Sequence, residues 1–116
     1  MNDKTQILAV LKDAAKKCEE LEVEANFLLL NHDEMKKVLI ERANIIINLP
    51  AEIRKVSSDK SLLIEIGDLA NLAILARNMA KNSKGLFGLM VMLTPHEAKT
   101  GDPNFLEEII QKLEKE

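Results

Sequence analysis

Apolar residues recur at alternating intervals of four and three along the first quarter of the chain. This spacing places them on one stripe of an α-helix, and it predicts a long helix from Asp3 to Leu30. A seam of this kind is typical of helices that pack side by side in a bundle, so it already favours an all-α fold. The stripe consists of Ile7, Leu11, Ala14, Cys18, Leu21, Ala25 and Leu28.

The rest of the sequence continues the helical pattern with few interruptions. Only four Gly and three Pro occur in 116 residues, and no run alternates apolar and polar residues long enough to predict a strand. We therefore expect one all-α domain over residues 1–116, an antiparallel bundle of four to five helices. After the first helix, further helices are predicted at residues 33–49, from 57–59 to about 82, at 86–93, and from 103 through at least Leu113.

Helix boundaries are predicted from capping residues and prolines. Asp33 is the expected N-cap of the second helix, and Asp102 is that of the last, with Pro103 at its first position. The segment Ser57-Ser58-Asp59 is expected to open the third helix. Pro50 is expected to end or kink the second helix, after which residues 51–56 add a turn or two. Residues 96–102 are expected to form a loop.

The composition excludes several classes of protein. A net charge of −3, with Lys and Arg scattered among acids, argues against nucleic-acid binding. The longest unbroken apolar run, Leu86 to Leu93, is far shorter than the roughly 20 residues that cross a membrane. The amino-terminal residues lack the pattern of a secretory signal, so we expect a cytoplasmic protein. The single cysteine, Cys18, is expected to be a buried thiol.

Two acidic residues interrupt the most apolar segment, residues 62–80, with the sequence LLIEIGDLANLAILARNMA. Glu65 and Asp68 are three residues apart, and little of this helix can face water. An unpaired carboxylate in such surroundings costs several kcal/mol, roughly, so both should meet a cation, an arginine or hydrogen-bond donors. The alternative is that they pair with arginines of the chain or lie at a solvent-exposed seam.

A narrow polar stripe follows the second predicted helix and consists of Lys37, Glu41, Asn44 and Asn48. If this helix packs antiparallel to the helix of Glu65 and Asp68, we expect Glu41 to face Glu65. Carboxylate and amide oxygens would then gather between the two helices. Such oxygens are the ligands that hard cations prefer, so the pattern outlines a cation site.

These two segments resemble the MazG-like all-α nucleoside triphosphate pyrophosphatases, a group related to dimeric dUTPases. The family carries Glu-x-x-Glu and Glu-x-x-Asp on paired helices, and the corresponding residues here are Glu41-Arg-Ala-Asn44 and Glu65-Ile-Gly-Asp68. The flanking segments LIERANIIINLPAEIRK and EIGDLANLAILARNMAKN are also similar to the two motif helices. The resemblance covers about residues 33–82.

The resemblance implies hydrolysis of a nucleoside triphosphate to its monophosphate and pyrophosphate. Mg²⁺ would be held by Glu41, Asn44, Glu65 and Asp68, with the three acids as the catalytic residues. Asn44 stands where the family has a second Glu and offers a carbonyl oxygen without charge, so weakened magnesium binding and activity are expected. Weaker candidates for contacts with the substrate phosphates are the basic residues Lys37, Arg42, Arg77 and Lys81.

The alternative function is a non-catalytic helical oligomerisation or partner-binding module that has kept the fold. With either function we expect a homodimer or higher homo-oligomer, because the apolar stretches 28–30 and 86–93 exceed what one thin bundle can cover. Glu22 is expected to form a salt bridge within the bundle, to Arg42, in preference to acting as a fifth ligand. His32 and His96 fall in predicted loops and are expected to be solvated.

Overall fold

The computed structural model describes residues 4–28, 30–82, 86–95 and 102–116. These residues form five α-helices and no strand, so the all-α prediction is confirmed for this part of the chain. The helices are α1 (Lys4–Asn26), α2 (His32–Arg54), α3 (Lys60–Lys81), α4 (Phe87–Val91) and α5 (Phe105–Lys115).

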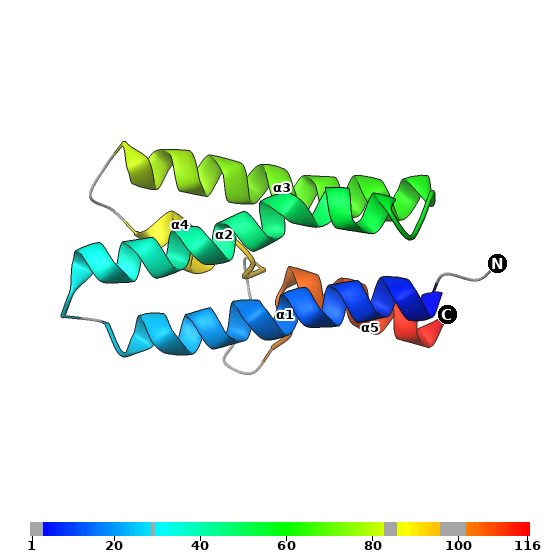
Figure 1. Cartoon of the computed structure of the whole chain (residues 1–116), viewed down its shortest axis with the longest axis horizontal. Coiled ribbons are helices and arrows are strands. Elements are labelled where there is room, and N and C mark those ends of the chain that lie inside the picture. Colours follow the sequence, from blue (N-terminus) through cyan, green and yellow to red (C-terminus); the bar gives the residue numbers. More distant parts are fainter. Residues whose placement is uncertain (1–3, 29, 83–85, 96–101) are drawn as a thin grey trace.

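The three long helices run antiparallel in chain order, with α1 packed on α2 and α2 packed on α3 (Figure 1). The two short helices lie toward opposite ends of the molecule. There, α4 contacts α3 and α2, whereas α5 packs chiefly along α1 (Figure 1). The fourth column of the bundle is therefore built from two short helices in succession. The whole measures 48 × 27 × 23 Å.

One apolar core joins all five helices. Its large, fully buried side chains are aliphatic, as a chain without Trp or Tyr requires, and they interdigitate along the axis of the bundle. Cys18 lies among them, as expected for a buried thiol. The largest of these fully buried aliphatic residues are Leu11, Ile46, Ile53, Ile66, Leu89 and Leu106.

The turn between α1 and α2 differs from the sequence prediction. The first helix ends at Asn26, four residues before the expected Leu30. Asn31, not Asp33, is the N-cap of α2, because its side-chain oxygen accepts a hydrogen bond from the backbone N–H of Glu34 at 3.2 Å. Asp33 instead lies in the first turn of α2, where its negative charge is favourable to the helix dipole.

Pro50 does not end the second helix. The chain stays helical to Arg54, within the turn or two that residues 51–56 were expected to add. A proline inside a helix removes one backbone hydrogen bond. The last turn is nevertheless held in place because it buries Ile53 completely in the core.

The start of α3 matches the prediction and the start of α5 does not. Asp59 caps α3 by accepting hydrogen bonds from the N–H groups of Ser61 and Leu62, at 2.9 and 3.3 Å. The cap of α5 is Asn104, which forms a reciprocal capping box with Glu107, so the predicted cap at Asp102 is wrong. A capping box satisfies two backbone N–H groups at once, and this favours the later start. Most of the predicted loop 96–102 lies outside the described residues.

Candidate functional site

The residues expected to bind magnesium lie at different levels of the α2–α3 pair. The two helices are antiparallel neighbours, as predicted (Figure 1). Their register is marked by a hydrogen bond of 2.9 Å that Arg77 Nη1 of α3 donates to Asn44 Oδ1 of α2. Arg77 lies twelve residues after Glu65, or roughly 18 Å along the helix axis. Because the helices are antiparallel, Glu41 lies still farther from Glu65.

The expected meeting of Glu41 with Glu65 is therefore wrong. Glu41 lies thirteen residues before α2 ends at Arg54, whereas Glu65 lies only five residues after α3 begins at Lys60, and a short turn joins the helices. Within the described ranges, no three His, Cys, Asp or Glu side chains are close enough to hold a metal ion together. The four oxygen ligands expected from the sequence are not gathered at one place.

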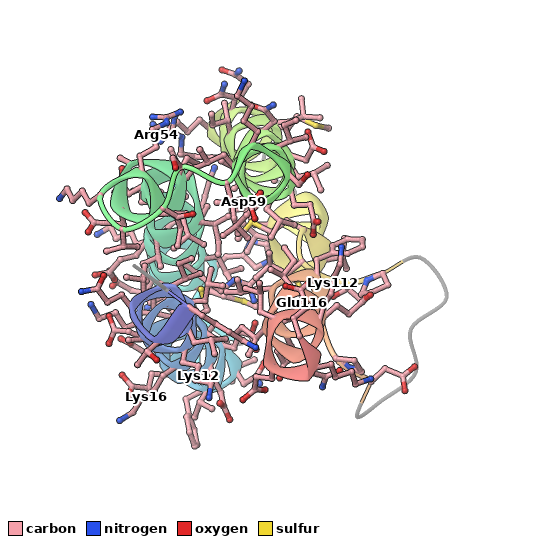
Figure 2. The ribbon with its side chains drawn as sticks, turned by 90° about the vertical axis from the view of Figure 1, so that its right-hand side faces the viewer. Lys12, Lys16, Arg54, Asp59, Lys112 and Glu116 are labelled. Atoms are coloured by element: carbon pink, nitrogen blue, oxygen red, sulfur yellow. The ribbon has the colours of Figure 1, made fainter. Side chains whose placement is uncertain are left out.

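Glu65 and Asp68 do share one surface, a groove of about 400 Å³ between α3 and α5. We call it the α3–α5 groove. Glu65 accepts a hydrogen bond of 3.1 Å from Lys112 Nζ on α5, and this bond raises the pKa of Lys112. In the view along the bundle, Lys112 extends from α5 at the end of the molecule where Asp59 caps α3 (Figure 2). Asp68 is exposed and forms no ion pair with any residue that the structure describes. The groove is floored by Leu69, Leu72, Phe105 and Ile109.

A buried arginine ties three helices together. Arg42 of α2 is only 3% exposed, and its Nη1 donates to Glu22 Oε1 of α1 at 2.5 Å. Its Nη2 donates to the backbone oxygens of Leu89 and Met90, with the bond to Met90 at 3.3 Å. These oxygens belong to the last turn of α4, where carbonyl groups lack partners within the helix. The expected salt bridge between Glu22 and Arg42 is confirmed, and we call the whole set the Arg42 junction.

The four residues considered for phosphate contacts have different surroundings. Arg42 is enclosed in its junction, and Arg77 is half-buried against Asn44. Lys37 forms an exposed ion pair with Glu34 at 3.3 Å, and Lys81 is exposed at the end of α3. Of the four, only the two lysines are therefore exposed. Of the two histidines, His32 is exposed at the start of α2, and His96 lies outside the described residues.

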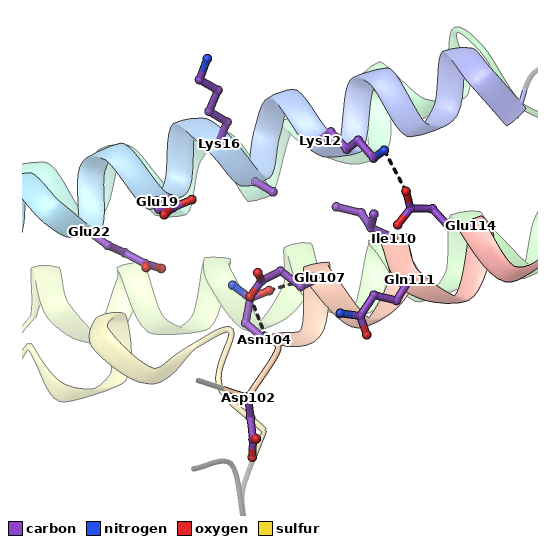
Figure 3. Close-up of a pocket in the computed structure, with 11 residues that line it drawn as sticks. Lys12, Lys16, Glu19, Glu22, Asp102, Asn104, Glu107, Ile110, Gln111 and Glu114 are labelled. Carbon is purple, nitrogen blue, oxygen red and sulfur yellow. Dashed lines mark hydrogen bonds and ion pairs between the residues drawn. The ribbon is translucent and has the colours of Figure 1, made fainter. Parts of the chain in front are cut away.

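A second open groove runs between α1 and α5 and encloses about 540 Å³ (Figure 3). Its lining is mostly polar, and much of it is paired. Lys12 of α1 forms an ion pair of 2.9 Å with Glu114 of α5, and Asn104 bonds Glu107 in the capping box. Sequence reasoning missed both grooves. Each has α5 as one wall, and the amphipathic pattern of α5 does not say which helices it will lie beside.

Nine large apolar side chains of the described residues are exposed, and seven of them fall into two groups. The tip patch surrounds the α1–α2 turn and consists of Val23, Phe27 and Leu30, which are 51%, 85% and 105% exposed. The outer row follows α3 and consists of Ile64, Leu72, Leu75 and Met79, which are 44% to 64% exposed.

The apolar stretch 86–93, expected to dimerise, is instead largely part of the core. Leu86, Leu89, Met92 and Leu93 are buried, and only Met90 and Val91 among its described side chains are substantially exposed. The stretch folds back against α2 and α3, which supply the apolar cover that a second chain was expected to provide. Among the described residues, no helix is long and apolar enough to cross a bilayer.

Comparisons with models of known protein families, with curated proteins and with solved structures gave no match to this chain. Its function is therefore inferred from its own geometry.

Proposed function

We propose that this chain is a non-catalytic helical assembly module, which binds other proteins through apolar side chains outside its core. The observation that carries the proposal is the outer row, whose members share one side of α3. The opposite side of the same helix packs in the core through Leu62, Ile66 and Ala73. A helix with a second, exposed apolar side of this kind marks an interaction surface.

The surroundings of the expected magnesium ligands support this function over catalysis. Glu65 is paired with Lys112 and Asn44 with Arg77, so two of the four ligands already have partners within the chain. Glu41 lies more than three turns of helix from the level of Glu65, as the register indicates. The Glu65–Lys112 ion pair joins α3 to α5, and the Asn44–Arg77 hydrogen bond joins α2 to α3. Both contacts therefore have a structural role.

The proposal includes the expected homodimer and assigns its contact to the tip patch. Phe27 and Leu30 are the most exposed large apolar residues of the described chain. Full burial of each such side chain stabilises a complex by about 1.5–3 kcal/mol. Two tips in contact would bury both residues from each copy.

Sedimentation velocity across concentrations of about 1–100 μM tests this dimer, because association depends on protein concentration. The parent is expected to dimerise, and the double variant Phe27→Ser, Leu30→Ser is expected to be monomeric with unchanged helicity. Leu75→Ser is the matched control, since it removes an exposed apolar residue from the outer row and should leave the dimer intact. A parent that stays monomeric throughout this range would remove the dimer from the proposal.

A magnesium-dependent nucleoside triphosphate pyrophosphohydrolase is the second candidate. It is favoured by one observation: Glu65 and Asp68 face the same open groove. Release of pyrophosphate from a panel of nucleoside triphosphates, with and without Mg²⁺, separates the two functions. Activity that requires Mg²⁺ and is lost in Asp68→Asn would establish the hydrolase and overturn the non-catalytic role. The assembly module predicts no release from either protein.

A further inference from the structure

The α3–α5 groove combines an apolar floor with an acidic rim. Leu72 belongs to both the groove and the outer row, so the two form one continuous surface along α3. The loose packing that leaves the groove open has a simple origin, because α5 packs chiefly on α1 and only lightly on α3. The result is a trough between two roughly parallel walls, one of them a 22-residue helix.

The charges of the rim do not cancel. Glu65 is neutralised by Lys112 at 3.1 Å. Asp68 and Glu108 also line the groove, and neither forms an ion pair within the described ranges. Two negative charges therefore flank the apolar floor, one on each wall. They favour a ligand that has apolar groups along its centre and positive charges on both sides.

We propose that the α3–α5 groove binds an amphipathic helix of another protein, with Lys or Arg residues flanking its apolar face. This inference rests on the proposed function as an assembly module and names the class of its partner. An apolar face with side chains at i, i+3, i+4 and i+7 is the form that such troughs accept. Basic residues beside that face would approach Asp68 on one wall and Glu108 on the other.

A second copy of this chain fits the groove less well. Its outer row carries Asp68 between Ile64 and Leu72, one turn from each, so two rows in contact would each bring an acid to an acidic surface. Like charges brought together oppose association, so the outer row of a second copy is disfavoured in the groove.

The test uses two synthetic peptides of about 18 residues, long enough for five helical turns. Both peptides carry Leu at i, i+3, i+4 and i+7. The remaining positions are Lys in the basic peptide and Glu in the acidic peptide. Binding is measured by fluorescence anisotropy at low and high salt, and the contact is mapped by backbone chemical shifts. The basic peptide is expected to bind the parent at least about tenfold more tightly than the acidic one, with weaker binding at high salt.

Charge reversal on the rim provides the decisive comparison. The double variant Asp68→Lys, Glu108→Lys should lose at least about tenfold in affinity for the basic peptide. The control Glu20→Lys, Glu24→Lys makes the same change in net charge away from the groove and should bind like the parent. All four positions are exposed, so circular dichroism is expected to show the parent fold for both variants.

Each contrary result has a distinct meaning. Equal binding of the two peptides, or an equal loss in both double variants, would overturn the basic partner while leaving the assembly module in place. Shifts confined to residues outside α3 and α5 would overturn the groove as the site. Self-association that is lost in Leu72→Ser would show that a second copy occupies it instead. The homodimer experiment on the tip patch is independent of these outcomes.

Discussion

Ion pairs serve different purposes at the Arg42 junction and in the α3–α5 groove. Arg42 is enclosed, and its hydrogen bonds join α1, α2 and α4. In the groove, Lys112 and Glu65 form an ion pair open to water, beside two acids that have no such partner within the described chain. A buried charge that loses its partner cannot be rehydrated, and this destabilises the protein. The ion pair of the Arg42 junction therefore stabilises the fold and is not free to bind a ligand. The charges of the groove remain available to a ligand.

The largest expected effect separates these two regions by stability. Arg42→Ala should lower the free energy of unfolding by about 3–5 kcal/mol, because it leaves two carbonyl oxygens of α4 and a carboxylate without their donor. Lys112→Ala, at the exposed pair, should leave stability unchanged within error. Urea denaturation of both variants measures the difference. Similar losses in the two proteins would mean that the groove is also committed to the fold.

A second prediction concerns alkaline pH near the junction. Burial raises the pKa of Cys18 from 9.0 to about 11, while the nearby Arg42 charge acts in the opposite direction. Below pH 9 the thiol is protonated in both the folded and unfolded states, so its contribution to the free energy of unfolding is fully present. Between pH 9 and 11 only the unfolded state loses the proton, and stability should fall with a slope approaching about 1.4 kcal/mol per pH unit.

Cys18→Ala isolates the contribution of the thiol, since the parent and the variant have every other titrating group in common. The difference in unfolding free energy between the parent and the variant should be constant below pH 9 and should shrink above it. A constant difference up to pH 11 would show that the thiol is accessible to water. Alkylation by iodoacetamide, slow in the folded parent and fast in urea, gives an independent measure.

Asn44→Glu would create a new ion pair, and its burial would lie between that of the Arg42 junction and that of the α3–α5 groove. The new carboxylate would meet Arg77, whose Nη1 now donates to the amide oxygen of Asn44 at 2.9 Å. Charge-assisted hydrogen bonds are stronger than neutral ones, so stability at pH 7 should rise by about 1 kcal/mol. The gain should disappear as the pH falls below the pKa of the glutamate.

The same variant also tests the catalytic alternative. If Asn44 were a magnesium ligand, the added carboxylate would tighten Mg²⁺ binding, and the thermal stability of the variant would depend on Mg²⁺. Thermal melts with and without the ion give the answer. We expect equal shifts for parent and variant, because the new carboxylate would pair with Arg77.

The smallest expected effect lies on α3, the helix that lines the groove. A Cβ atom added at Gly67 would have no atom within 4 Å apart from the chain neighbours and the backbone of its own helix. Gly67→Ala should therefore stabilise the protein by about 0.5–1 kcal/mol through the lower entropy of the unfolded chain. Thermal denaturation measures it, and a decrease in stability would indicate that α3 bends at this residue.

The sequence predicted the individual helices better than their relative positions. Periodicity located all five helices, and the polar segment Ser57-Ser58-Asp59 marked the start of the third, because these depend on residues within a turn of one another. The salt bridge between Glu22 and Arg42 was also foreseen, since each residue lies on an apolar face that must turn inward. The longitudinal register of α2 against α3 was not predicted, and this register separates Glu41 from Glu65. Register depends on how core side chains fit together, which no local pattern specifies.

The division of the fourth column into α4 and α5 sets an order for folding. The helices α1, α2 and α3 meet their neighbours in sequence, so only short loops must close before they pack. By contrast, α5 returns to α1 across most of the chain, and its closure is entropically the most costly. It is therefore expected to dock last and to open first, with amide protons that exchange faster than those of the three long helices. A partner bound between α3 and α5 would slow that exchange, because it would hold α5 in its docked position.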